Sequence, residues 1–84
     1  MKFQLELENR AKKELFSLSR EIQEKLIEVL DHLEANPRPP GAKKLTGQEA
    51  YRVRKGDYRI LYTIDDKLGL VRVYRIGHRR EIYR

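Results

Sequence analysis

Arginine and tyrosine side chains gather in two short stretches in the second half of the chain. The stretches are Tyr51 to Tyr62, with the sequence YRVRKGDYRILY, and Gly77 to Arg84, with the sequence GHRREIYR. Guanidinium groups repel one another when they line up on one face of a β-sheet, so a protein that aligns them has a use for an anion there. The chemistry that this pattern suits is the binding of phosphate groups, and RNA is the polyanion that we expect.

The positive charge of the chain is confined to its second half. Residues 1–42 carry seven Lys or Arg and eight Asp or Glu, whereas residues 43–84 carry twelve and five, so the net charges are −1 and +7. A one-sided distribution focuses a positive field that attracts nucleic acid or an acidic protein. A membrane surface fits less well, because the basic residues lie in strand-like sequence and not along an amphipathic helix.

Length and composition narrow the class of protein further. The chain has 84 residues, no cysteine and two histidines. We therefore expect a single domain over residues 1–84, without a disulfide, a metal site or another cofactor. The N-terminus alternates apolar and polar residues, and no stretch approaches the roughly 20 apolar residues that cross a bilayer. The expected location is the cytoplasm, without a membrane partner.

The first half of the chain predicts one strand and two helices. Phe3, Leu5 and Leu7 alternate with polar residues, which is typical of a strand with one buried face. Asn9 and Ser19 are suited to cap the two helices that follow. Apolar residues at helical spacing in the second helix predict a stripe that packs in the core, made of Ile22, Leu26, Val29, Leu30 and Leu33. Asn36-Pro37 ends that helix, and residues 36–49 are predicted to form a loop.

After this loop the pattern returns to a period of two and predicts a β-hairpin. Gly56-Asp57 is suited to a type II′ turn between its strands. That turn pairs Lys55 with Tyr58 and Arg54 with Arg59, which leaves one apolar face and one face that carries Arg52, Arg54 and Arg59.

A third run, from Leu70 to Gly77, brings Arg72, Arg75 and the terminal basic cluster beside the hairpin. The predicted architecture is therefore α+β, with an antiparallel-rich, four-stranded sheet and two N-terminal helices packed on one face.

The order of strand, two helices and three strands, with GDYRILY at residues 56–62 and GHRREIY at residues 77–83, resembles the RelE toxins of the RelE/ParE superfamily. The resemblance covers nearly the whole chain and implies the RelE-like β-α-α-β-β-β fold. It also implies the toxin of a type II toxin–antitoxin system, a ribosome-dependent endoribonuclease that cuts mRNA in the decoding site. The implied partners are an acidic RelB-like antitoxin, the ribosome with its mRNA, and operator DNA only through the antitoxin complex.

Cleavage of RNA without a metal ion requires activation of a 2′-hydroxyl, stabilisation of charge on the phosphoryl oxygens and protonation of the departing 5′-oxygen. Arginine suits the second task. The resemblance implies that Arg59 lies against the scissile phosphate, that Arg79 is the C-terminal catalytic arginine, and that Tyr83 stacks on a base or orients a nucleotide.

The sequence departs from the best-studied relative at Arg52 and Arg54, where that relative carries catalytic lysines. Arginine, with a pKa above about 12, holds its proton too firmly to act as a base, so we expect both residues to bind phosphate and Arg54 to lower the barrier electrostatically. His78 is the candidate for proton transfer, against the alternative that it hydrogen-bonds the backbone at a strand end. The remaining predicted substrate contacts, through solvated cations, are Lys43, Lys44 and Arg80.

Two other functions remain open at this stage. One is a ParE-like toxin of the same fold, which inhibits DNA gyrase by binding it; the presence of Arg59, Arg79 and Tyr83 argues against that function. The other is a non-catalytic basic binding module whose arginines seat an acidic partner or operator DNA. Charge alone does not separate this module from the nuclease, because an antitoxin also requires a basic face.

Overall fold

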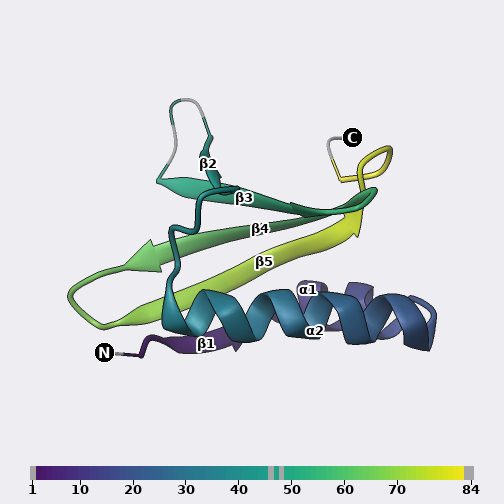
Figure 1. The fold of residues 1–84 in the computed structure, drawn as a ribbon, viewed down its shortest axis with the longest axis horizontal. Coiled ribbons are helices and arrows are strands. Elements are labelled where there is room, and N and C mark those ends of the chain that lie inside the picture. Colours follow the sequence, from purple (N-terminus) through teal and green to yellow (C-terminus); the bar gives the residue numbers. More distant parts are fainter. Residues whose placement is uncertain (1, 46, 48, 83–84) are drawn as a thin grey trace.

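The computed structural model describes residues 2–45, 47 and 49–82 of the chain. Its elements are β1 (Gln4–Leu7), α1 (Asn9–Phe16), α2 (Arg20–Ala35), β2 (Lys43–Lys44), β3 (Ala50–Lys55), β4 (Tyr58–Asp65) and β5 (Leu70–His78). The strands form one sheet in the order β1-β5-β4-β3-β2, and both helices lie on one face of it (Figure 1). The pair β1 and β5 is parallel, and the other pairs are antiparallel. The α+β class is confirmed.

The sheet has five strands, where the sequence predicts four. The additional strand is β2, which lies inside the segment 36–49 that was predicted as a loop, and its Lys43 pairs with Arg52. Two consecutive exposed lysines carry no alternating apolar pattern, so the strand has no signal of its own. It forms because the outer edge of β3 offers unpaired backbone groups to the chain that passes beside it.

One of the two predicted helix caps is confirmed. The Ser19 hydroxyl accepts a hydrogen bond from the backbone N–H of Ile22 at 3.3 Å and caps α2. The prediction for Asn9 is wrong, because α1 already begins at Asn9, and its N-cap is Glu8, without a side-chain bond. The Glu8 N–H is held by the carbonyl of Val73 on β5, so the chain turns into the helix directly after the strand. Within the described residues, neither helix is long and apolar enough to cross a bilayer.

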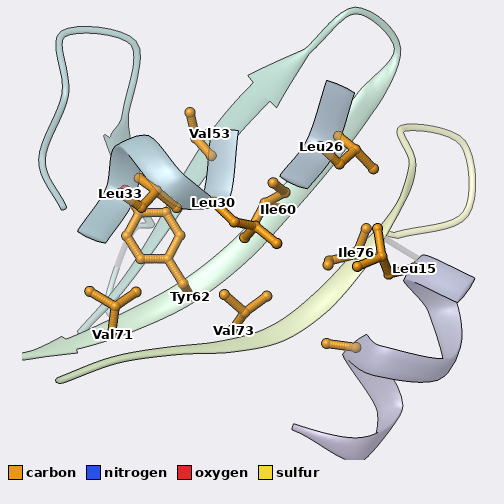
Figure 2. Close-up of a cluster of buried hydrophobic side chains, with 11 residues drawn as sticks. Leu15, Leu26, Leu30, Leu33, Val53, Ile60, Tyr62, Val71, Val73 and Ile76 are labelled. Carbon is orange, nitrogen blue, oxygen red and sulfur yellow. The ribbon is translucent and has the colours of Figure 1, made fainter. Parts of the chain in front are cut away.

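The core lies between the helices and the sheet face that they cover (Figure 2). Leu26, Leu30 and Leu33 of α2 are all buried, as the helical spacing predicts. Tyr62 of β4 is fully buried beside Leu33, and its hydroxyl donates a 2.7 Å hydrogen bond to the carbonyl of Pro37. Burial raises the pKa of Tyr62 to about 12. This hydrogen bond ties the segment after α2 to the centre of the sheet.

The hairpin of β3 and β4 has the predicted register, with Lys55 opposite Tyr58 and Arg54 opposite Arg59. Gly56 has a φ of +59° while Asp57 has a negative φ, as the two central positions of a type II′ turn require. Between β4 and β5 the register shifts at Tyr62, where β5 carries one extra residue, Tyr74. This bulge changes which side chains of β5 face the helices, so that Val71, Val73 and Ile76 are all buried.

Candidate anion-binding site

Three residues lie side by side on adjacent strands near the turn between β3 and β4. Arg59 of β4 is paired with Arg54 of β3 on one side and with Gly77 of β5 on the other. Neighbouring residues along a strand point to opposite faces, and Ile60 is buried under the helices. The row of Arg54, Arg59 and Gly77 therefore belongs to the opposite face of the sheet.

Arg59 is a buried cation, only 7 % exposed. Its Nη1 atom donates to the carbonyl oxygens of Gly56 at 3.3 Å and Tyr58 at 3.2 Å. Within the described residues, its Nε atom is buried without a hydrogen-bond partner. Buried charges are normally paired, and an unsatisfied buried donor carries a desolvation cost of about 1–3 kcal/mol or more. Among the described residues, the bonds of Arg59 go to carbonyl oxygens and not to a carboxylate, which makes this side chain the candidate for binding an anion from outside.

Arg79 lies at the same end of the sheet as Arg59. Its backbone N–H donates to the carbonyl of Asp57 at 2.8 Å, and its Nε atom is 3.7 Å from a carboxylate oxygen of Asp57. Both guanidinium groups are thus held by the turn at residues 56–57. The sequence patterns predicted both arginines as site residues. They assigned Asp57 only to the turn and did not predict its ion pair with Arg79.

His78 makes the backbone contact that was the alternative to a role in catalysis. Its ring lies edge-on to Tyr58, with centroids 5.5 Å apart, and its Nδ1 atom accepts a hydrogen bond from the backbone N–H of Arg80 at 3.1 Å. An accepting Nδ1 requires the neutral imidazole to carry its proton on Nε2. In this arrangement His78 offers a hydrogen-bond donor to a ligand, and the geometry favours a donor over a general base.

The basic surface extends from Arg54 toward β2. Lys43 is exposed and directly opposite Arg52, which is half-buried in β3, and the register puts both on the face of Arg54 and Arg59. Lys44 points to the other face, and its ammonium is 3.6 Å from the carboxylate of Glu49. Arg80 is exposed just beyond β5. Tyr83 lies outside the described residues.

Two arginines that the sequence places beside the hairpin are neutralised by carboxylates from other elements of the molecule. Arg75 of β5 donates to Glu14 of α1 at 3.0 Å, and the same carboxylate accepts from the backbone N–H of Ile76 at 3.0 Å. Arg72 lies 3.5 Å from Glu6, its neighbour on β1. Since the partners come from the first elements of the chain, no local pattern reveals that these two cations are already occupied.

At the opposite end of β4, Arg38 joins the segment after α2 to the turn before β5. Its guanidinium donates to both carboxylate oxygens of Asp66, at 2.9 and 3.1 Å, and to the hydroxyl of Tyr51 at 3.2 Å. The hydrogen bonds to Arg38 hold the pKa of Asp66 below its usual value, and those to Asp66 and Tyr51 raise the pKa of Arg38. This cluster supports the segment that leads into β2.

Known proteins with similar sequences identify the family of the chain. The family described as the ParE toxin of the type II toxin–antitoxin system parDE matches residues 5–83. The RelE1 protein of Methanocaldococcus jannaschii is 34% identical over 90 residues, which covers 100% of this chain and 98% of that protein.

Solved structures agree as well. The archaeal RelE–RelB complex from Pyrococcus horikoshii contains a chain with a TM-score of 0.84 and 28% identity, covering 96% of this chain and 99% of that one. For the RelBE2 toxin–antitoxin complex from Mycobacterium tuberculosis the TM-score is 0.83 and the identity 26%, with coverage of 93% and 99%. The fold and the matched residues define the toxin half of a type II toxin–antitoxin system. The chain belongs to the ParE toxin family and, within the RelE/ParE superfamily, is a RelE-type toxin.

Proposed function

We propose that this toxin is a ribosome-dependent, metal-independent endoribonuclease that cleaves translated mRNA and so arrests translation. The observation that carries the proposal is Arg59, a buried guanidinium whose Nε atom has no partner among the described residues. A cation kept in this state inside a folded domain is prepared for a phosphate and not for solvent.

The arginines stabilise the charge that develops on the phosphoryl oxygens. Arg59 is held in place by two carbonyl oxygens, and Arg54 lies beside it on β3. Arg79 approaches from the segment after β5 and is oriented by Asp57. Preorganised donors of this kind act where charge builds up, and removal of one typically lowers kcat by about 10²–10³.

Proton transfer depends on how the RNA is positioned. His78 presents a donor, and Asp57 is engaged with Arg79, so the described part of the chain holds no prepared pair of acid and base at this place. Alignment of the 2′-hydroxyl with the phosphate can supply a large part of the barrier reduction. We therefore assign that task to the ribosome, and expect free toxin to cut naked RNA slowly. In this scheme Tyr83 stacks on a nucleotide base, as the family resemblance implies.

The partner that neutralises the toxin is an acidic RelB-like antitoxin in the cytoplasm. Two of the similar solved structures are toxin–antitoxin complexes, one of RelE with RelB and one of the RelBE2 pair. The net charge of +7 in residues 43–84 also favours binding to an acidic chain. Operator DNA is bound only through the toxin–antitoxin complex.

The second candidate function is inhibition of DNA gyrase, because the matching family carries the name of ParE. A gyrase inhibitor acts by binding a protein. Such binding does not require a buried guanidinium with an unpaired donor, as Arg59 has among the described residues. The third hypothesis is a non-catalytic basic binding module. The presence of Arg59 and Arg79 at one end of the sheet favours the nuclease over both.

Primer extension on a translated message after induction of the toxin tests the proposal, with gyrase supercoiling measured in parallel. We expect mRNA cleavage, growth arrest and unaffected supercoiling. Arg79→Ala should abolish cleavage and arrest, while antitoxin binding changes by no more than about 1–2 kcal/mol, because a broad interface tolerates the loss of one rim charge.

The matched control is Arg20→Ala, an arginine whose side chain is 93% exposed on α2, the helix that covers the opposite face of the sheet from the site. This variant should cleave like the unaltered toxin. Full toxicity of Arg79→Ala, or loss of supercoiling without mRNA cleavage, would overturn the nuclease assignment.

A further inference from the structure

Gly77 is a glycine that the fold itself does not require. It lies in β5 with a negative φ, and a Cβ atom built on it meets no atom of the described residues within 4 Å. The bulge of β5 is at Tyr74 and does not involve it. A glycine inside a strand weakens the strand, and it often marks a place where a ligand or another backbone approaches closely.

The place of Gly77 in the sheet indicates what approaches. It is the direct neighbour of Arg59 across β4 and β5, in the row that begins with Arg54. Because Gly77 has no side chain, the sheet surface beside the buried guanidinium of Arg59 is backbone alone, and no atom of the described residues lies within 4 Å of the Cβ position above it. A ligand can therefore descend to the level of Arg59, which is only 7 % exposed.

We propose that Gly77 is the floor of a binding site for the ribose–phosphate backbone of single-stranded RNA. The inference rests on the proposed nuclease function and specifies which part of the RNA touches the sheet. A phosphodiester is flanked directly by two riboses, so it reaches a recessed cation only where the protein surface beside that cation is flat. A carboxylate of an acidic peptide is carried on a flexible stem and reaches the same cation without such clearance. Bare backbone next to Arg59 therefore fits RNA better than a peptide.

A methyl group at residue 77 is expected to act on the ligand and not on the fold. It would project into the space beside Arg59 and hold the RNA backbone away from the guanidinium, where the attraction falls with distance. The fold has room for the same methyl group, and alanine is preferred to glycine in a strand. Loss of binding without loss of stability is thus the signature of a ligand floor.

The test compares Gly77→Ala and Gly77→Val with Gly41→Ala. Gly41 is a matched control, because it also has a negative φ and open space at its Cβ position, but it lies in the segment before β2. Melting temperatures are measured first, and we expect no decrease for Gly77→Ala. Binding is then followed by NMR titration with a short oligonucleotide built on 2′-deoxyribose, which cannot be cleaved, and with a short oligoglutamate peptide.

We expect Gly77→Ala to weaken oligonucleotide binding by about tenfold and Gly77→Val to weaken it more, with oligoglutamate binding and the Gly41→Ala variant unchanged. Equal oligonucleotide binding by Gly77→Ala and the unaltered chain would overturn the inference, and so would a parallel loss of oligoglutamate binding, which would assign the floor to a peptide. The two proposals can also fail separately. If the variants change oligonucleotide binding as expected but the unaltered chain does not cut mRNA on ribosomes, the nuclease proposal fails, whereas the assignment of Gly77 to the binding surface stands.

Discussion

The ion pair between Asp57 and Arg79 leads to a testable prediction about the state of the site before RNA binds. Its carboxylate lies 3.7 Å from Nε of Arg79, so it occupies the same guanidinium that the proposed mechanism directs at a phosphate. If Asp57 competes with RNA for Arg79, the variant Asp57→Asn releases that cation and strengthens binding. Asparagine keeps the backbone carbonyl that accepts from the Arg79 N–H at 2.8 Å and is well tolerated in turns.

The size of the effect follows from the exposure of the pair. The side chains of Arg79 and Asp57 are 55% and 63% exposed, and ion pairs of this kind are worth about 0–1 kcal/mol. The affinity for a short oligonucleotide should therefore rise by no more than about fivefold. One more arginine free to neutralise a phosphate should steepen the dependence of log K on log salt by about 0.7 for a single strand.

Titrations of the oligonucleotide at several salt concentrations measure both quantities. Asp65→Asn is the matched control, because it removes one negative charge from the turn at the other end of β4 and retains the side-chain oxygen that accepts from Leu68 N–H. An affinity of Asp57→Asn below that of the unaltered toxin would show that Asp57 only orients Arg79. Equal gains for Asp57→Asn and Asp65→Asn would refute the local competition.

Two further predictions concern the supports of the site. Tyr62→Phe removes the buried donor to the Pro37 carbonyl and should lower the free energy of unfolding, measured in urea, by about 1–2 kcal/mol. Tyr51→Phe, which removes an exposed bond with Arg38, should lower it clearly less. Equal losses for the two variants would contradict the role of burial. The lowered pKa of Asp66 means that its stabilising contribution is present above the ordinary aspartate value of 3.8 and is lost as the pH falls below it. The difference in urea midpoint between the unaltered toxin and Asp66→Asn should therefore shrink on acidification, and a constant difference between pH 6 and 3 would refute the role of the Arg38 contact.

Local patterns predicted most of the sheet and its hairpin. The turn at residues 56–57 determined the pairing of Arg54 with Arg59, because turn type and register are linked and a shift by one residue would expose the apolar face. The stripe of Leu26, Leu30 and Leu33 was equally clear, since helical spacing places them on one side of α2.

The features that local patterns missed depend on distant parts of the chain. Strand β2 forms only because β3 provides an edge for it. Arg75 looked like a member of the basic cluster, yet Glu14, 61 residues earlier, neutralises it. The bulge at Tyr74 breaks the period of two in β5 and brings Ile76 into the core.

The burial of Arg59 was also outside what the sequence could predict. Arginine is rarely buried, and nothing in the hairpin pattern separates it from the exposed Arg54 beside it. The structure does connect Arg59 and Arg79 to the same turn, the first through the carbonyl of Gly56 and the second through the carboxylate of Asp57. Their joint action on a phosphate stays a prediction.

Reconstituted cleavage tests the central claim most directly. Purified toxin is mixed with a defined message, either free or engaged in ribosomes with an open decoding site, and the cleavage rate is measured for the unaltered chain and for Arg59→Ala. We predict rapid cutting only on ribosomes, and a rate for Arg59→Ala at least about 10²-fold lower. Equal rates for the two proteins, or cutting of the free message as fast as the ribosome-bound one, would contradict the account.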